Sequence, residues 1–225
     1  MSDLTHTSLR RPLTGIDRLL SQIDKRLRQL AGEAKSLPKA ASRPSPAVNH
    51  DESTLSPIER EHAAGLMRVN HTGEVCAQAL YQGQALAARS DDTREKLLDA
   101  AKEEADHLAW CKARLTELGA EPSRLNPLFY ATSLVLGAAT AMAGDKVSLG
   151  LVHATEERVA SHLRSHLKAL PGEDRKSQLI LQQMLKDEER HGAEALEHGG
   201  VEFPRPVKDL MTLASQLMTR TTYWI

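Results

Sequence analysis

The chain has 225 residues, a formal net charge of −1 and only 3% aromatic residues. This length allows one domain with a full hydrophobic core, and the near-neutral charge gives no electrostatic basis for binding nucleic acid. Because Ala and Leu are plentiful and aromatic residues are scarce, the composition favours closely packed helices over sheets. We therefore expect an all-α protein without a nucleic-acid partner.

The first 56 residues differ in pattern from the rest of the chain. Between Thr14 and Leu30, apolar residues recur at helical spacing among Lys and Arg. This pattern predicts a basic amphipathic helix, which either docks on the rest of the protein or lies on a membrane surface. Residues 33–56 contain several Ser and Pro and predict a linker. We expect an N-terminal region at 1–56 and a helical domain at 57–225.

Two helical hairpins are predicted within the helical domain. Ser56 and Pro57 are the preferred residue types for the cap and the first position of a helix, so a long helix is expected to begin there. Turn-forming residues at 89–92 separate the two helices of the first predicted hairpin, and those at 170–174 separate the two helices of the second.

Two further segments have an apolar character. Residues 128–144 contain no charged residue, but 17 positions are just short of a comfortable membrane span. We expect either a buried crossover helix between the hairpins or a helix that dips into one leaflet. The final segment ends in Tyr223-Trp224, which suits either a last helix packed on the bundle or a contact with the membrane interface.

The spacing Glu-x-x-His occurs twice, and in a helix it places both side chains on one face. Each occurrence follows an upstream Glu, at a distance of 30 positions in the first hairpin and 32 in the second. Antiparallel hairpins with turns midway would bring all these side chains to one level of a four-helix bundle. The candidate residues are Glu74, Glu104, His107, Glu156, Glu188 and His191.

Carboxylates that point into a helix bundle are costly unless a cation is bound among them. Two divalent ions would neutralise four carboxylates. Mixed oxygen and nitrogen donors favour iron or manganese over calcium, and the lack of a thiolate disfavours a structural zinc site. We predict a two-metal site and no catalytic residue beyond its ligands.

Metal-bound histidines usually donate their second N–H to a carboxylate. Asp187, beside Glu188, is placed to reach His107 across the bundle, and Glu103 is placed to do the same for His191. His162 lies near the predicted site in sequence and is a candidate for an accessory role.

Four motifs resemble those of the demethoxyubiquinone hydroxylases, a family of the ferritin-like di-iron carboxylate superfamily. They are Asn70-His71-Thr72-Gly73-Glu74, Glu104-Ala105-Asp106-His107, Ala154-Thr155-Glu156-Glu157 and Asp187-Glu188-Glu189-Arg190-His191. The resemblance covers about residues 57–225. It implies a ferritin-like four-helix bundle of two antiparallel hairpins, with an apolar crossover helix and extra terminal helices.

The resemblance also implies an activity. The expected enzyme is a di-iron monooxygenase that uses O₂ to hydroxylate the ring of a polyprenyl demethoxyubiquinol in ubiquinone biosynthesis, with electrons from NADH or from the quinol. Glu74, Glu104 and His107 would bind one iron ion, and Glu156, Glu188 and His191 the other. Glu104 and Glu188 would bridge the two.

A substrate with a polyprenyl tail lives in the bilayer, so the resemblance implies a peripheral protein on the cytoplasmic side of the cell membrane, or on the mitochondrial inner membrane in a eukaryote. No secretory signal is visible at the N-terminus, and Cys76 and Cys111 form no CxxC motif, which agrees with an intracellular protein. Other ubiquinone-biosynthesis proteins are possible partners.

Two alternatives remain at this point. A ferroxidase or a rubrerythrin-like peroxidase could use the same scaffold, although a ferroxidase gives no reason for the apolar segment at 128–144 and the CxxC module typical of rubrerythrins is missing. A metal-free membrane protein that binds lipid belongs to a different class, and metal analysis would separate it from the enzymes.

Overall fold

The computed structural model describes residues 42–225, and every regular element in that range is a helix. The helix predicted between Thr14 and Leu30 lies outside the described residues. In chain order the helices are α2 (Pro57–Ala87), α3 (Asp91–Glu117), α4 (Asn126–Ala143), α5 (Asp145–Ala169), α6 (Arg175–Glu197) and α7 (Arg205–Thr222). The all-α prediction is confirmed for this part of the chain.

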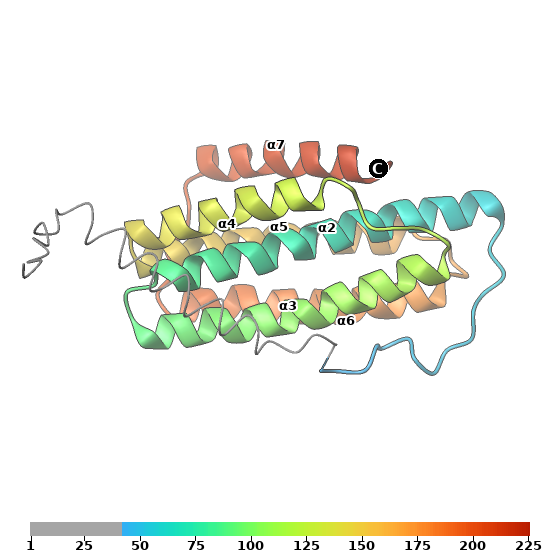
Figure 1. Cartoon of the computed structure of the whole chain (residues 1–225), viewed down its shortest axis with the longest axis horizontal. Coiled ribbons are helices and arrows are strands. Elements are labelled where there is room, and N and C mark those ends of the chain that lie inside the picture. The colour runs from blue at the N-terminus through green and yellow to red at the C-terminus, as the bar shows by residue number, and fades with distance from the viewer. Residues whose placement is uncertain (1–41) are drawn as a thin grey trace, which may run out of the picture. The chain divides into compact units, whose positions relative to one another are not determined.

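The centre of the structure is a four-helix bundle. Helices α2 and α3 form one antiparallel hairpin and α5 and α6 form the other, with α2 packed beside α5 and α3 beside α6 (Figure 1). This is the ferritin-like arrangement that the spacing of the Glu and His motifs predicts. Helix α4 and helix α7 lie outside the bundle, on the side opposite to α3 and α6 (Figure 1).

Local sequence sets where the bundle helices begin. The Ser56 hydroxyl accepts a hydrogen bond from the Glu59 backbone N–H at 3.3 Å, and the Glu59 carboxylate accepts one from the Ser56 backbone at 2.9 Å. Ser90 and Asp174 cap α3 and α6 in a similar way, each accepting a backbone N–H at 3.1 Å. Both predicted turns are therefore confirmed, because these caps stop each hairpin from continuing as one helix.

Helix α4 carries the chain from one hairpin to the other along the outside of α2 (Figure 1). The two backbones touch at a pair of glycines. A Cβ atom at Gly83 would lie 2.1 Å from the Leu134 carbonyl oxygen, and one at Gly137 would lie 2.2 Å from the Leu80 carbonyl oxygen. Only glycine allows so close an approach.

Of the two alternatives for this crossover helix, the buried one is wrong. Of its residues only Gly137 and Ala141 are buried, and the opposite face leaves large apolar side chains in solvent. Those side chains are Leu128, Val135, Leu136 and Met142. Among residues 42–225, no helix combines the length and hydropathy needed to cross a bilayer.

Helix α7 is fixed to the bundle at its C-terminal end. The Tyr223 hydroxyl lies 2.6 Å from His62 Nδ1, and Arg68 Nη1 donates to the Tyr223 carbonyl at 2.6 Å. The Tyr223 ring sits over Gly65, where a Cβ would lie 2.6 Å from the ring. The last segment thus packs on the bundle, yet it also leaves an apolar row exposed along its length: Val207, Leu210, Leu213 and Leu217.

Residues 42–56, which we call the strap, contain no helix and pack on the bundle through the buried side chains of Ala47 and Leu55. Both Glu52 carboxylate oxygens pair with Arg114, at 2.5 and 2.9 Å. Arg114 is only 1% exposed and also donates to Asp174 at 2.8 Å. The strap is therefore tied to α3 and to the start of α6, while a domain boundary at residue 56 stays a prediction.

The contact between α2 and α4 predicts opposite effects for two glycine substitutions on one helix. Gly83→Ala should destabilise the protein by about 1–3 kcal/mol, because the added methyl would meet backbone atoms of α4. Gly73→Ala should be neutral or stabilise by up to about 1 kcal/mol, because a Cβ there meets no atom within 4 Å and alanine favours the helix. Urea unfolding followed by circular dichroism measures both, and equal effects would contradict the close packing.

Candidate metal centre

Polar side chains from all four bundle helices meet at one level of the core. They are Glu74 on α2, Glu104 and His107 on α3, Glu156 on α5, and Glu188 and His191 on α6. Each of the six is at most 4% exposed. A hydrophobic cluster lies on either side of this level, one around Met67, Leu115 and Met184 and the other around Tyr81, Leu97 and Val152. The polar group therefore lies between two apolar layers.

Glu104 and Glu188 lie between the two histidines and offer one oxygen to each. His107 Nδ1 is 3.2 Å from Glu104 Oε2 and 3.1 Å from Glu188 Oε1. His191 Nδ1 is 3.4 Å from Glu104 Oε1 and 3.7 Å from Glu188 Oε2. The two halves of the cluster are thus related by an approximate twofold arrangement.

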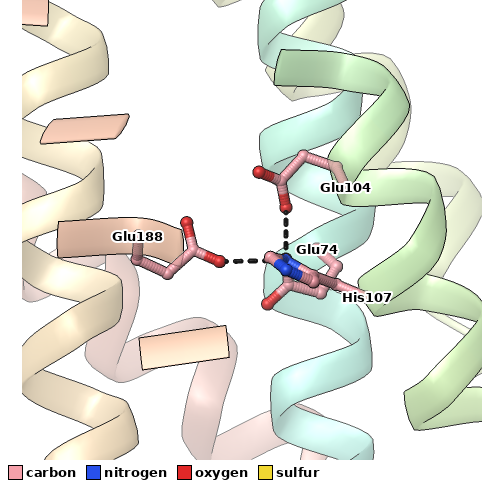
Figure 2. A group of neighbouring side chains, drawn as sticks. All are labelled: Glu74, Glu104, His107 and Glu188. Carbon is pink, nitrogen blue, oxygen red and sulfur yellow. Dashed lines mark hydrogen bonds and ion pairs between the residues drawn. The ribbon is translucent and has the colours of Figure 1, made fainter. Parts of the chain in front are cut away.

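Glu74 and Glu156 complete the two halves. Figure 2 shows the first half, in which Glu74 Oε2 lies 3.5 Å from His107 Nδ1 and the side chains of α2, α3 and α6 converge. In each half, four potential ligand atoms lie within 4.8 Å of one another. Glu104 and Glu188 belong to both groups, so each is placed to bridge two ions.

Burial and charge repulsion shape the protonation of the cluster when no cation is bound. Burial, together with repulsion from the neighbouring carboxylates, raises the pKa of Glu74 and of Glu156 well above the usual value. Burial opposes charge on the histidines as well, but the facing carboxylates outweigh it and raise the pKa of His191 to about 12. The same balance raises the pKa of His107. Without metal, protons must supply the positive charge that the carboxylates need.

The donor set fits a pair of divalent ions. Within the described residues, both carboxylate oxygens of Glu156 and of Glu188, and His191 Nδ1, are buried and form no hydrogen bond. Buried polar atoms without partners are costly, so their presence at one point indicates a ligand. Four carboxylates and two imidazoles match the charge and the mixed oxygen and nitrogen preference of iron or manganese.

The outer nitrogen of each histidine faces a carboxylate on the opposite hairpin. His107 Nε2 lies 3.0 Å from Asp187 Oδ2, and His191 Nε2 lies 3.6 Å from Glu103 Oε2. Hydrogen bonds from His107 and Arg43 outweigh the effect of burial and lower the pKa of Asp187 to about 2. The His107 contact is the shorter and less exposed of the two, so the two halves differ in their outer support.

His162 does not lie in the cluster. It stands on α5 beside an apolar cavity, with Nε2 3.5 Å from Ser215 Oγ on α7. The polar residues just before Glu74 have contacts outside the cluster too. Thr72 Oγ1 lies 2.8 Å from Asn126 Oδ1, and Asn70 Oδ1 lies 2.7 Å from His166 Nδ1, so these residues tie α2 to α4 and α5.

The cavity has a volume of about 390 Å³ and lies among α2, α4, α5 and α7. Its wall is largely apolar, with Phe129, Leu151 and Met211 among the lining residues. Glu74 also lines it, so the cavity reaches the polar cluster. Arg158 adds a buried Nε that has no hydrogen-bond partner in the described chain. A cavity of this size and lining suits an apolar ligand with a few polar atoms.

One residue that contacts the centre is absent from the sequence-based prediction. Arg43, in the strap, pairs with Asp187 at 2.9 Å and approaches His107 Nε2 to 3.3 Å. Its neighbours Ser42, Pro44 and Ser45 are typical of a linker, and no periodic pattern marks it. Only the folding of the strap onto α3 and α6 reveals its place.

Comparison with known proteins agrees with the geometry. The family model described as "Ubiquinone biosynthesis protein COQ7" matches residues 61–222. A "3-demethoxyubiquinol 3-hydroxylase" of Ectopseudomonas mendocina is 54% identical over 215 residues, which are 96% of this chain and 98% of that protein.

Proteins of the same name from Azotobacter vinelandii and Legionella pneumophila are 54% and 51% identical, over 96% and 93% of this chain and 98% and 97% of their own lengths. The family match covers the region of this chain that contains all six buried Glu and His residues, and the relatives match nearly the full length of the chain. The chain belongs to the family of the ubiquinone biosynthesis protein COQ7.

Proposed function

We propose that this chain is a di-iron monooxygenase that hydroxylates the ring of a polyprenyl 3-demethoxyubiquinol. The observation that carries the proposal is a buried cluster of four carboxylates and two histidines that opens onto an apolar cavity through Glu74. The relatives that share about half of all residues over nearly the whole chain bear the name of this activity.

The reaction sets what the site must handle. One atom of O₂ enters the ring as a hydroxyl and the other leaves as water, so two electrons and two protons are also needed. NADH or the quinol itself would provide the electrons. A bound pair of iron ions would supply the redox chemistry that O₂ requires, held by Glu74, Glu104 and His107 on one side and by Glu156, Glu188 and His191 on the other.

The chain's own residues would bind and orient the quinol. The apolar lining of the cavity would hold the ring and the first part of the tail, and would exclude water from the reacting ring carbon. The unpartnered Arg158 Nε is available to donate a hydrogen bond to a ring oxygen. Because Glu74 lies both in the cavity wall and in the cluster, a ring in the cavity would lie against the metal site.

We further propose that the exposed faces of α4 and α7 rest on a membrane. Both helices line the cavity and both expose a row of large apolar side chains, which a soluble surface rarely carries together. A lipid surface would cover these rows and bring the polyprenyl tail to the cavity. The proposed location is therefore the membrane periphery, on the cytoplasmic side of the cell membrane, or on the mitochondrial inner membrane in a eukaryote.

Substitution of a carboxylate that belongs to both groups should change the number of bound metal ions more than substitution of one that belongs to a single group. The chain should bind about two Fe²⁺ ions. Glu188→Gln should lose both, because Glu188 contributes to both groups, whereas Glu156→Gln should keep about one, because Glu156 belongs to a single group. Glu157→Gln is a matched control, since the neighbouring Glu157 side chain is 58% exposed. Metal analysis of the purified anaerobic proteins provides the counts, and two ions on Glu188→Gln would contradict the bridging role.

Complementation tests the activity itself. Expression of the chain in a bacterium that lacks its own demethoxyubiquinone hydroxylase should restore ubiquinone, measured in lipid extracts by mass spectrometry. His107→Ala should reduce ubiquinone to the level of the empty host, because a ligand of the centre is lost. Glu157→Gln should rescue as the wild-type chain does. Failure of the wild-type chain to rescue, with two irons bound, would favour a ferroxidase or peroxidase instead.

Charge on the outer face of α7 should weaken membrane binding. Leu210 and Leu213 are 67% and 64% exposed and do not line the cavity. Leu210→Asp with Leu213→Asp should weaken liposome binding more than tenfold, since each buried leucine contributes about 1.5–3 kcal/mol. Ile58→Asp, at an 80% exposed position on α2, should not. Co-flotation with vesicles measures binding, and equal flotation of all variants would overturn the proposed face.

A further inference from the structure

The strap delivers Ser42 and Arg43 to the outer face of α3 and α6, directly behind the cluster. Asp106 on α3 is 2% exposed and receives hydrogen bonds from the Ser42 backbone at 2.5 Å and from Arg43 Nε at 2.8 Å. The Ser42 hydroxyl adds a further contact at 3.0 Å. Asp106 is therefore an anchor that fixes where the Arg43 side chain enters.

From this anchor the guanidinium reaches across to α6. Arg43 Nη1 donates to Asp187 Oδ2 at 2.9 Å, and the same oxygen lies 3.0 Å from His107 Nε2. Gln183 holds the other oxygen of Asp187 at 3.1 Å. The Asp187 carboxylate is thus held from two sides in the orientation that accepts the His107 N–H.

A second contact runs through Trp110. The Arg43 guanidinium lies 4.9 Å from the centre of the Trp110 ring, and Trp110 Nε1 donates to the Arg43 carbonyl at 3.2 Å. The Trp110 ring is in turn 5.3 Å from the His107 ring, centre to centre. Arg43 therefore limits the movement of His107 by way of a carboxylate and by way of an aromatic ring.

The strap contacts the other half of the centre more weakly, because Arg43 Nη2 lies 3.8 Å from Glu103 Oε2, compared with 2.9 Å from Arg43 Nη1 to Asp187 Oδ2. Behind His191 stands Glu103, which pairs with Arg190 at 2.5 Å but lies 3.6 Å from the imidazole. The Glu103 and Arg190 side chains are 31% and 43% exposed. Ion pairs this exposed contribute little, so His191 is held less firmly from behind than His107.

We propose that Arg43 is a positioning residue that orients the ligand His107 through Asp187, so that the strap holds one of the two metal positions more tightly than the other. This inference rests on the proposed di-metal function and goes beyond it, because it assigns a role to a residue outside the bundle and makes the two metal positions unequal. Loss of a carboxylate that orients a metal-bound histidine typically weakens metal binding by about 10–100-fold.

The test is a Co²⁺ titration of the full-length chain. Calorimetry measures the affinity of each binding step, and visible absorption reports the coordination of the bound ion. The wild-type chain should bind two ions. Arg43→Met keeps an apolar stem against Trp110 but removes the guanidinium, and should weaken one binding step by about 10–100-fold while leaving the other within about threefold. The absorption spectrum of the more weakly bound Co²⁺ ion should also change. A lower stability of the folded protein alone would not change this spectrum.

Two further variants make the result specific. Arg43→Lys keeps the charge and should recover part of the lost affinity, and it serves as the second variant should Arg43→Met fold poorly. Arg190→Met removes the corresponding arginine of the other half and should change neither step by more than about threefold. Two unaltered binding steps and an unaltered spectrum in Arg43→Met would overturn the inference alone. A wild-type chain that binds no Co²⁺ would overturn the metal centre, and this inference with it.

Discussion

The structure depends on the need to stabilise four carboxylates in a dry helix core. Glu74, Glu104, Glu156 and Glu188 are each at most 1% exposed and are enclosed by apolar layers. Charge at such a place is tolerable only with protons or cations close by. Without metal, protons provide the positive charge, as the raised pKa values of Glu74, Glu156 and both histidines indicate. The same atoms form two groups that could each hold a metal ion.

The bundle meets this need through repetition. Each hairpin provides one lone Glu and one Glu-x-x-His pair, and the turns capped by Ser90 and Asp174 bring these to the same height. Because the hairpins pack with an approximate twofold relation, one pattern used twice produces two equivalent sets of ligand atoms that share Glu104 and Glu188. The strap and the helices outside the bundle do not follow this twofold relation, so they make the surroundings of the two halves different.

Sequence reasoning succeeded where residues follow a helical repeat and failed where no repeat marks the residue. The turns, the caps and the convergence of six polar residues all follow from helical spacing and from the equal arms of each hairpin. The spacing also suggested that Asp187 would face His107, and the two lie 3.0 Å apart. Arg43 could not be found this way, because it lies in an irregular segment and meets Asp187, 144 positions away, only after folding. The sequence left two alternatives open for α4, because an uncharged helix is apolar whether protein or another surface covers its second face, and only the fold excludes the buried one.

The two sides of the bundle are therefore unlike, and the difference is useful. On the side of α3 and α6, the strap and its ion pairs cover the outer nitrogen of His107 and restrict the movement of this side chain. Helices α4 and α7 lie on the opposite side of the bundle (Figure 1). They leave a cavity that reaches Glu74, and their exposed faces are apolar. A site that would hold metal and also admit a large apolar substrate needs a rigid support behind its histidines and an open path to its carboxylates. Because the strap supports the side of α3 and α6 and the cavity lies on the side of α2 and α5, the same four helices can provide both.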